Sequence, residues 1–318
     1  MKILIPGGSG QVGTILARAF HGEGHEVVVL SRAPRTAPWR VVAWDGRTLG
    51  AWTHELDGAD VVINLAGRSV NCRYTRRNRQ LIMDSRIEST RAVGEAITKA
   101  DRPPALWLQA STATIYAHRY DAPNDEATGI LGGSEPDVPS TWRFSIDVAR
   151  TWEETAQSFD LPDTRLVLMR LAVAMSPDRG GTFDFLLGLV RRGLGGTNGD
   201  GRQYVSWIHE QDFIRAVNWL IERDDLAGAV NLAAPNPLPN AEFMRVLRQA
   251  WGTRIGLPAS DWMLEVGTLL MRTETELVLK SRRVVPGRLV ENGFTFDYPA
   301  WPEAAEDLCR HWRAESSR

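Results

Sequence analysis

Cysteine and lysine are the side chains that this 318-residue sequence has least of. Its two cysteines, Cys72 and Cys309, cannot build a disulfide framework or a four-thiolate metal site, so we expect no bound metal and a reducing compartment, by default the cytoplasm. No apolar run approaches the ~20 residues that a membrane span needs. A net charge of −2 provides no field that would gather nucleic acid or an anionic membrane, which leaves a small-molecule substrate as the expected partner.

Apolar runs alternate with helical patterns along the first half of the chain. The runs that we predict to be buried strands are residues 2–6, 26–31, 39–44, 60–67, 105–112 and 165–173. Helical patterns follow Gly13 and occupy about residues 77–100 and 145–158. This alternation predicts an α/β fold with a doubly wound parallel sheet, in which ligands bind at the carboxyl ends of the strands.

Three glycines lie at regular spacing between the first predicted strand and the first predicted helix. In the segment GGSGQVG, Gly7 permits a tight turn, Gly10 lets the backbone approach a pyrophosphate, and Gly13 lets the helix pack closely on the strand. Within a β-α-β unit, this spacing predicts a dinucleotide site of the Rossmann type. We therefore expect residues 1–175 to form the dinucleotide-binding domain, with a strand at 229–234 returning to it.

The rest of the chain, residues 176–228 and 235–318, is expected to form a smaller lobe. Glycine-rich turns and prolines interrupt helical patterns there, and the last pattern is an amphipathic helix. This helix-rich C-terminal lobe would hold the substrate against the domain that binds the dinucleotide.

The second predicted strand ends at Ser31 and Arg32, where an NAD site usually has an acidic residue that accepts the ribose hydroxyls. A guanidinium forms paired hydrogen bonds with a phosphate, whereas a carboxylate would repel one. The pair therefore favours NADP(H) as the cofactor over NAD(H). The alternative interpretation of Arg32 is a solvated surface arginine.

Other arginines also have two interpretations. Arg86, in the long predicted helix, is either an anion ligand or a residue that faces water. The basic run formed by Arg73, Arg76, Arg77 and Arg79 is typical of a solvated loop and helix start, but it could also line the mouth of a pocket for an acidic ligand.

Several motifs, taken in order, resemble those of the extended short-chain dehydrogenases/reductases. Besides GGSGQVG, they are NLAG at residues 64–67, STATIY at 111–116 and GDGRQYVSWIHEQD at 199–212. The pair SR after the second strand, together with TRRNRQLIMDSR, NAEF and SRRVVPGRLVENGFTFDYP, narrows the resemblance to an atypical epimerase-like family. Members of that family carry a small C-terminal domain of unknown function.

This resemblance covers nearly the whole chain and implies that NADP(H) is the cofactor. The residues that it implies for binding are Gly7, Ser9, Gly10, Gln11, Val12, Gly13, Ser31, Arg32, Leu65, Ala66, Gly67 and Arg86.

One catalytic pair of short-chain dehydrogenases is missing. These enzymes transfer a hydride while a Tyr, placed four residues before a Lys, moves the proton. The sequence has three lysines, Lys2, Lys99 and Lys280, and the residues four positions before the last two are Glu95 and Glu276. A Tyr-x-x-x-Lys pair is therefore absent.

In the helix where this pair is expected, Phe144 and Val148 stand at its positions. Thr112 matches the hydroxyl that orients a substrate oxygen in the family, unless it is an ordinary strand-end threonine. Tyr116 is the second catalytic candidate, although nucleotide-sugar relatives keep a tyrosine there in addition to the catalytic one. The other nearby proton donors are Tyr120 and His118.

The GDGRQYVSWIHEQD segment supplies three more expectations. Nucleotide-sugar enzymes have an arginine that clamps the diphosphate where this chain has Val205, so a more apolar substrate pocket is indicated. We expect His209 to brace the turn into the next helix and Asp212 to cap that helix.

Three functions follow from these features. The first is an NADP(H)-dependent oxidoreductase that acts on an unidentified, rather apolar carbonyl compound. The second is a non-catalytic NADP(H)-binding sensor or scaffold. The third is a nucleotide-sugar epimerase, against which both the missing pair and Val205 count.

Overall fold

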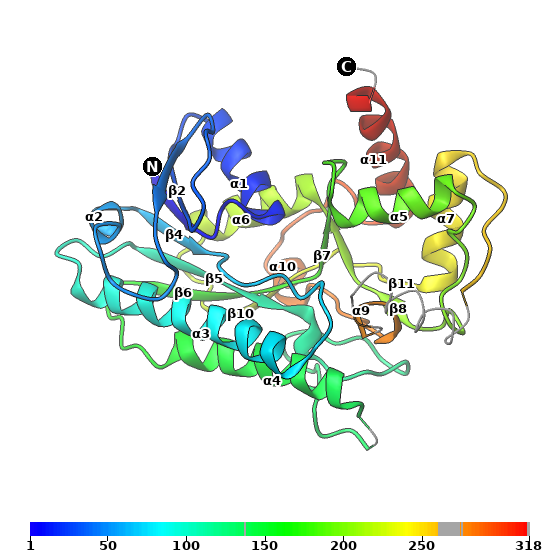
Figure 1. Cartoon of the computed structure of the whole chain (residues 1–318), viewed down its shortest axis with the longest axis horizontal. Coiled ribbons are helices and arrows are strands. Elements are labelled where there is room, and N and C mark those ends of the chain that lie inside the picture. Colours follow the sequence, from blue (N-terminus) through cyan, green and yellow to red (C-terminus); the bar gives the residue numbers. More distant parts are fainter. Residues whose placement is uncertain (137, 260–273, 275, 317–318) are drawn as a thin grey trace.

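The computed structural model of this chain describes residues 1–136, 138–259, 274 and 276–316. A seven-stranded sheet runs through its centre (Figure 1) in the order β10-β6-β5-β4-β1-β2-β3. Its strands are β1 (Lys2–Pro6), β2 (Glu26–Ser31), β3 (Arg40–Ala43), β4 (Val61–Asn64), β5 (Leu106–Thr112), β6 (Arg165–Leu171) and β10 (Gly228–Leu232). Every neighbouring pair is parallel, which confirms the predicted sheet.

Helices cover both faces of this sheet (Figure 1), as a doubly wound fold requires. The helices α1 (Gln11–Gly22) and α6 (Glu210–Glu222) lie on one face, and α3 (Arg76–Lys99) and α4 (Ser140–Gln157) lie on the other. Side chains alternate along β1, so that Ile3 and Ile5 pack with α1 and α6 while Leu4 packs with α3. The short helix α2 (Thr53–Leu56) follows β3.

A second apolar core lies beyond the sheet. It is shared by α5 (Thr182–Arg191), α7 (Asn240–Trp251) and α11 (Trp301–Ser316), which lie together at one end of the molecule (Figure 1). Its aromatic centre is Trp301, whose ring stacks on that of Phe243 at a centroid distance of 4.0 Å and touches that of Trp207.

The predicted domain boundary at residue 175 stays a prediction. Within the predicted smaller lobe, α6 and α10 (Gly287–Glu291) add Phe213 and Leu289 to the core of the main sheet. This follows from topology, because α6 is the crossover helix that leads into β10.

The run at residues 165–173 does not form one strand as predicted. It divides at Ala172 into β6 and β7 (Val173–Met175), because the chain leaves the main sheet there to pair with β9 (Trp207–His209). The amide of Val173 donates to the carbonyl of Ser206 at 3.2 Å. Helix α4 also begins earlier than predicted, directly after Pro139.

The remaining short elements lie near the carboxyl ends of the main strands. They are the 3-10 helix η1 (Ala113–Ile115), the antiparallel pair β8 (Tyr204–Val205) and β11 (Leu238–Pro239), and the helix α9 (Glu276–Leu279). Within the described residues, none of the helices combines the length and the apolar character that a membrane crossing needs.

Candidate functional site

The glycine loop between β1 and α1 contains two glycines that the fold itself requires. Gly7 has a φ of +76°, and a Cβ there would lie 2.6 Å from the Cα of Ala66. A Cβ at Gly13 would lie 2.4 Å from the Cα of Gly8, so α1 could not approach β1 with any larger residue. The predicted structural roles of both glycines therefore agree with the packing.

Gly10 differs from both of these glycines. A Cβ at this position would meet only the carbonyl oxygen of Gly7, at an ordinary 3.7 Å, so packing does not exclude a side chain. Gly10 is also the N-cap of α1, and no side chain caps the helix there. The first-turn N–H groups of α1 therefore have no side-chain acceptor at the N-cap, which suits an approaching phosphate.

Gln11 begins α1 and has a buried amide nitrogen with no hydrogen-bond partner among the described residues. It lies against Gly181, where a Cβ would come within 2.2 Å of its Nε2. A buried donor without an acceptor costs about 1–3 kcal/mol, so this amide fits a site that a ligand oxygen completes. The side chain of Val12 instead packs against the sheet core.

At the end of β2, the predicted cofactor residues lie side by side. The Ser31 hydroxyl donates to the Ser9 hydroxyl at 3.1 Å and accepts from the amide of Ala33 at 3.3 Å. Arg32 is exposed and has neither a hydrogen bond nor an ion pair within the described part of the chain. Its guanidinium is therefore available to a ligand.

Leu65, Ala66 and Gly67 follow β4 and lie beside the glycine loop. The amide of Leu65 donates to the carbonyl of Pro6 at 2.8 Å, and that of Ala66 donates to Asn64 Oδ1 at 3.2 Å. These bonds bring the end of β4 against Gly7 and leave little room for larger side chains.

Arg86 reaches the same place from α3. A Cβ at Gly67 would lie 3.2 Å from its Cζ, and its Nη1 donates to the carbonyls of Arg68 and Ile82, both at 3.1 Å. Its guanidinium lies 4.9 Å from the Trp152 ring centroid. Burial lowers the pKa of Arg86 to about 10, which keeps it cationic at neutral pH. The structure thus gathers the twelve predicted cofactor residues around the carboxyl ends of β1, β2 and β4, and their binding roles stay predictions.

Thr112 ends β5, where it caps η1. Its hydroxyl accepts from the amide of Thr114 at 3.2 Å. No further bond from this hydroxyl to the described residues uses its proton, which remains available for a ligand oxygen.

Tyr116 is held in a buried network. Its hydroxyl donates to Asn231 Oδ1 and accepts from Arg170 Nη1, each at 2.9 Å, and Arg170 pairs with Glu153 at 2.8 Å. Burial raises the pKa of Tyr116. The Tyr116 hydroxyl thus uses both its donor and its acceptor in bonds that join α4, β6 and β10. The catalytic role of Tyr116 stays a prediction, and this geometry does not favour it.

The other two predicted donors lie together on the loop after η1. His118 Nδ1 accepts from the amide of Ser281 at 2.9 Å, and burial lowers the pKa of this imidazole. The ring of Tyr120, which is 37% exposed, lies 5.0 Å from that of His118.

Phe144 and Val148 make apolar contacts from α4. Val148 packs with Tyr74 and Ile82, and the ring of Phe144 lies 5.2 Å from that of Tyr74. A cavity of about 530 Å³ opens beside them, lined by Tyr74, Arg76, Arg79, Gln80, Met83 and Phe144. Two arginines of the basic run, Arg76 and Arg79, thus line a cavity, as the second interpretation of that run expects.

Sequence reasoning did not identify the contribution of the C-terminal segment formed by α9 and the residues that follow it. Lys280 and Glu276 are almost completely buried, and Lys280 Nζ donates to the carbonyl of Thr114 at 2.7 Å. A signal was present, because Lys280 is one of three lysines in a chain whose basic residues are nearly all arginines.

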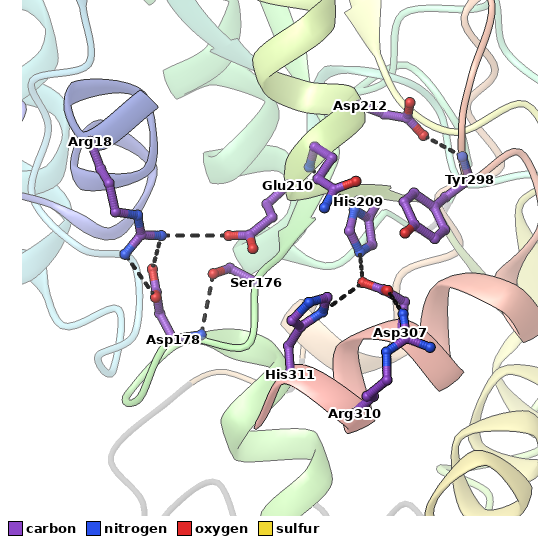
Figure 2. A network of polar contacts seen from close by, with 11 residues as sticks. Arg18, Ser176, Asp178, His209, Glu210, Asp212, Tyr298, Asp307, Arg310 and His311 are labelled. Carbon is purple, nitrogen blue, oxygen red and sulfur yellow. Dashed lines mark hydrogen bonds and ion pairs between the residues drawn. The ribbon is translucent and has the colours of Figure 1, made fainter. Parts of the chain in front are cut away.

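The expectation for Asp212 was wrong, while His209 does brace the turn. His209 is itself the N-cap of α6, since its Nδ1 accepts from the amide of Gln211 at 3.2 Å. Asp212 lies within the first turn of α6 and faces away from the helix end. Its two carboxylate oxygens accept from the amides of Asp297 and Tyr298, both at 2.8 Å (Figure 2).

His209 also joins α6 to the C-terminal helix α11. Its Nε2 lies 3.3 Å from Asp307 Oδ2, which also contacts His311 at 3.0 Å, and its ring stacks on Tyr298 (Figure 2). On the other side of Figure 2, Arg18 of α1 pairs with Asp178 at 2.9 Å. These contacts fix the two cores to each other and are structural.

Taken together, the strand order and the open, glycine-lined helix terminus define a Rossmann-type dinucleotide-binding protein. A model of the NAD dependent epimerase/dehydratase family matches residues 3–233, and one of a domain of unknown function, DUF1731, matches residues 259–308. The chain belongs to the NAD dependent epimerase/dehydratase family, which confirms the resemblance seen in the sequence.

Similar proteins are known from bacteria and humans. The human epimerase family protein SDR39U1 is 30% identical over 313 residues, covering 97% of this chain and 99% of that protein. An epimerase family protein of Staphylococcus aureus (strain MRSA252) is 30% identical over 311 residues, which cover 96% of this chain and 98% of its own.

Solved structures agree with this assignment. A crystal structure of human SDR39U1 (isoform 2) with NADPH superimposes with a TM-score of 0.85 at 28% identity, covering 98% of this chain and 99% of that one. A nucleoside-diphosphate sugar epimerase from Corynebacterium glutamicum has a TM-score of 0.74 at 27% identity and covers 97% of this chain and 58% of its own.

Proposed function

We propose that this protein binds NADP(H) in preference to NAD(H) and is an oxidoreductase that reduces the carbonyl group of a small molecule. The observation that carries the cofactor preference is Arg32, an exposed cation without a partner among the described residues at the end of β2. A carboxylate at that position would accept ribose hydroxyls and repel a 2′-phosphate. The NADPH in the human SDR39U1 structure supports the same choice.

The residues around the glycine loop fit this cofactor. Ser9, the open face at Gly10 and the unsatisfied amide of Gln11 would receive the pyrophosphate, and Ser31 and Arg32 would receive the 2′-phosphate. Leu65, Ala66 and Gly67 would lie beside the adenosine, with Arg86 behind them.

When bound, NADPH supplies a hydride, and the chain's own residues orient the acceptor. Thr112 can donate a hydrogen bond to a carbonyl oxygen because its hydroxyl already accepts from Thr114. The cavity beside Phe144 and Met83 offers apolar contact, while Arg76 and Arg79 at its wall suit a substrate that also carries an acidic group. Replacing Thr112 with Val should therefore slow the reduction.

Binding of NADPH and NADH, followed by nicotinamide fluorescence, tests the cofactor preference. We expect Arg32→Asp to lose about 10- to 100-fold in NADPH affinity, because hydrogen bonds to a charged group contribute about 1.5–3 kcal/mol. Arg35→Asp is the matched control, since Arg35 is an exposed arginine on the same loop. If the unmodified protein binds NADH as tightly as NADPH, the assignment of the 2′-phosphate fails.

One observation favours a second function, a non-catalytic NADP(H) sensor or scaffold. The positions of the usual catalytic pair are filled by Phe144 and Val148, which pack in an apolar cluster. That function predicts tight NADPH binding without NADPH oxidation on any member of a carbonyl panel. A nucleotide-sugar epimerase is disfavoured by Val205, and turnover of UDP- or dTDP-sugars would overturn this judgement.

A further inference from the structure

The C-terminal segment closes against the end of β5 next to the proposed substrate site. Besides the bond from Lys280, Arg282 Nε donates to the Thr114 hydroxyl at 3.0 Å. Thr114 lies two residues after Thr112, so the segment packs directly behind the residue proposed to orient the carbonyl. Glu276 accepts a short hydrogen bond from the hydroxyl of Ser145 on α4.

Tyr74 brings a phenol to this place from the loop before α3. Its ring packs on Phe144, which stands at the position expected for the catalytic tyrosine of short-chain dehydrogenases, and its hydroxyl lies 3.4 Å from Ser145 Oγ. Ser145 has a single proton, which the much shorter bond to Glu276 uses. The Tyr74 proton is therefore held only by a long contact, and Tyr74 also lines the 530 Å³ cavity.

The surrounding charges keep this phenol protonated. Burial and then the carboxylate of Glu276 raise the pKa of Tyr74 to about 12, against the opposing effect of Arg282 and Arg86. Lys280 lies further along the same segment, and Arg79 donates to the Tyr74 carbonyl from α3. Such a phenol is still far more acidic than an alcohol, so proton transfer to a forming alkoxide is favourable.

We propose that Tyr74 is the proton donor of this site, and that Ser145 and Glu276 position it across the boundary between the dinucleotide-binding domain and the C-terminal domain. The inference rests on the proposed reduction of a carbonyl. The carbonyl carbon gains the hydride of a reduced nicotinamide, the π electron pair moves to oxygen, and that oxygen takes the Tyr74 proton. The phenolate regains a proton from water in the cavity that Tyr74 lines.

This arrangement holds Tyr74 in the form that reduction needs, because its raised pKa keeps the phenol protonated near neutral pH. It also gives the C-terminal domain a role, because Glu276 contacts Tyr74 through Ser145.

The rate of NADPH oxidation with a panel of aldehydes, ketones and dicarbonyls, including 9,10-phenanthrenequinone, tests the donor. Tyr74→Phe should lower kcat about 100-fold or more, the usual contribution of a general acid, with an unchanged Kd for NADPH. Tyr204→Phe is the matched control, since the Tyr204 ring packs against Arg283 and no bond among the described residues joins its hydroxyl to Tyr74, Ser145 or Glu276. If the unmodified protein oxidises NADPH with no member of the panel, the oxidoreductase function fails and the donor role fails with it. If it is active and Tyr74→Phe equals Tyr204→Phe, this inference alone is wrong.

A second measurement tests the positioning residue without turnover. In protein labelled with [ζ-13C]tyrosine, the Tyr74 resonance is identified by its loss in Tyr74→Phe. Glu276→Gln keeps an acceptor for Ser145 but removes the charge, so the Tyr74 pKa should fall relative to the unmodified protein. An identical titration in both proteins would show that Glu276 does not act on Tyr74 and would overturn its positioning role.

Discussion

Alanine at two glycines of the β1–α1 loop separates what the fold requires from what the cofactor requires. In Gly13→Ala, the added methyl would lie 2.4 Å from the Cα of Gly8 and 2.7 Å from its carbonyl carbon. Both atoms belong to the backbone, so α1 must move away from β1. Overpacking of this kind costs about 1–3 kcal/mol of unfolding free energy.

Gly10→Ala should leave the fold nearly unchanged. The nearest atom to its methyl would be 3.7 Å away, and the backbone angles of Gly10, φ −79° and ψ 172°, are ordinary for alanine. Reduced entropy of the unfolded chain contributes about 0.4–1 kcal/mol of stability, and the poorer N-cap preference of alanine offsets about as much. The methyl would, however, occupy the open face where we place the pyrophosphate.

Urea unfolding and NADPH fluorescence titration of both variants should therefore give opposite results. We expect Gly13→Ala to unfold at a lower urea concentration, and Gly10→Ala to unfold like the unmodified protein while binding NADPH at least about 10-fold more weakly. Normal NADPH affinity in Gly10→Ala would refute the argument that the backbone approaches the cofactor at residue 10.

Two further predictions concern stability. Arg170→Met leaves Glu153 buried without its ion-pair partner and should lower the free energy of unfolding, measured in urea, by about 3–5 kcal/mol. Adding Glu153→Leu to Arg170→Met should recover most of that stability. An equal loss in the double variant would contradict the assigned pairing. Burial lowers the pKa of His209 to about 4, so the unfolded chain binds a proton below about pH 6.5 that the folded chain does not. Stability should thus be complete above pH 6.5 and fall toward pH 4 by up to about 3 kcal/mol. His209→Asn, which keeps an N-cap acceptor, should flatten this part of the profile, and an unchanged slope would show that another group titrates.

Local sequence predicted most of the sheet and the position of the glycine loop. Strands β1 and β2 have the bounds that their apolar runs indicated, because a strand buried on both faces has no polar positions to blur its ends. Glycine spacing located the loop, since the steric exclusion at Gly13 comes from Gly8, a neighbour in the same β-α-β unit, although that at Gly7 comes from Ala66 after β4. Asp212 was misplaced because its partners, Asp297 and Tyr298, are distant in sequence.

The sequence alone determined the parallel α/β fold, the dinucleotide loop, the cation at the end of β2 and the absence of a Tyr-x-x-x-Lys pair, since each depends on residue type at short spacing. Only the tertiary structure brought together the groups that we propose in place of that pair. Tyr74, Ser145 and Glu276 come from three segments separated by 71 and 131 residues, and no pattern along the chain relates them. They meet because parallel crossovers return successive segments to one edge of the sheet, where the C-terminal domain closes on them.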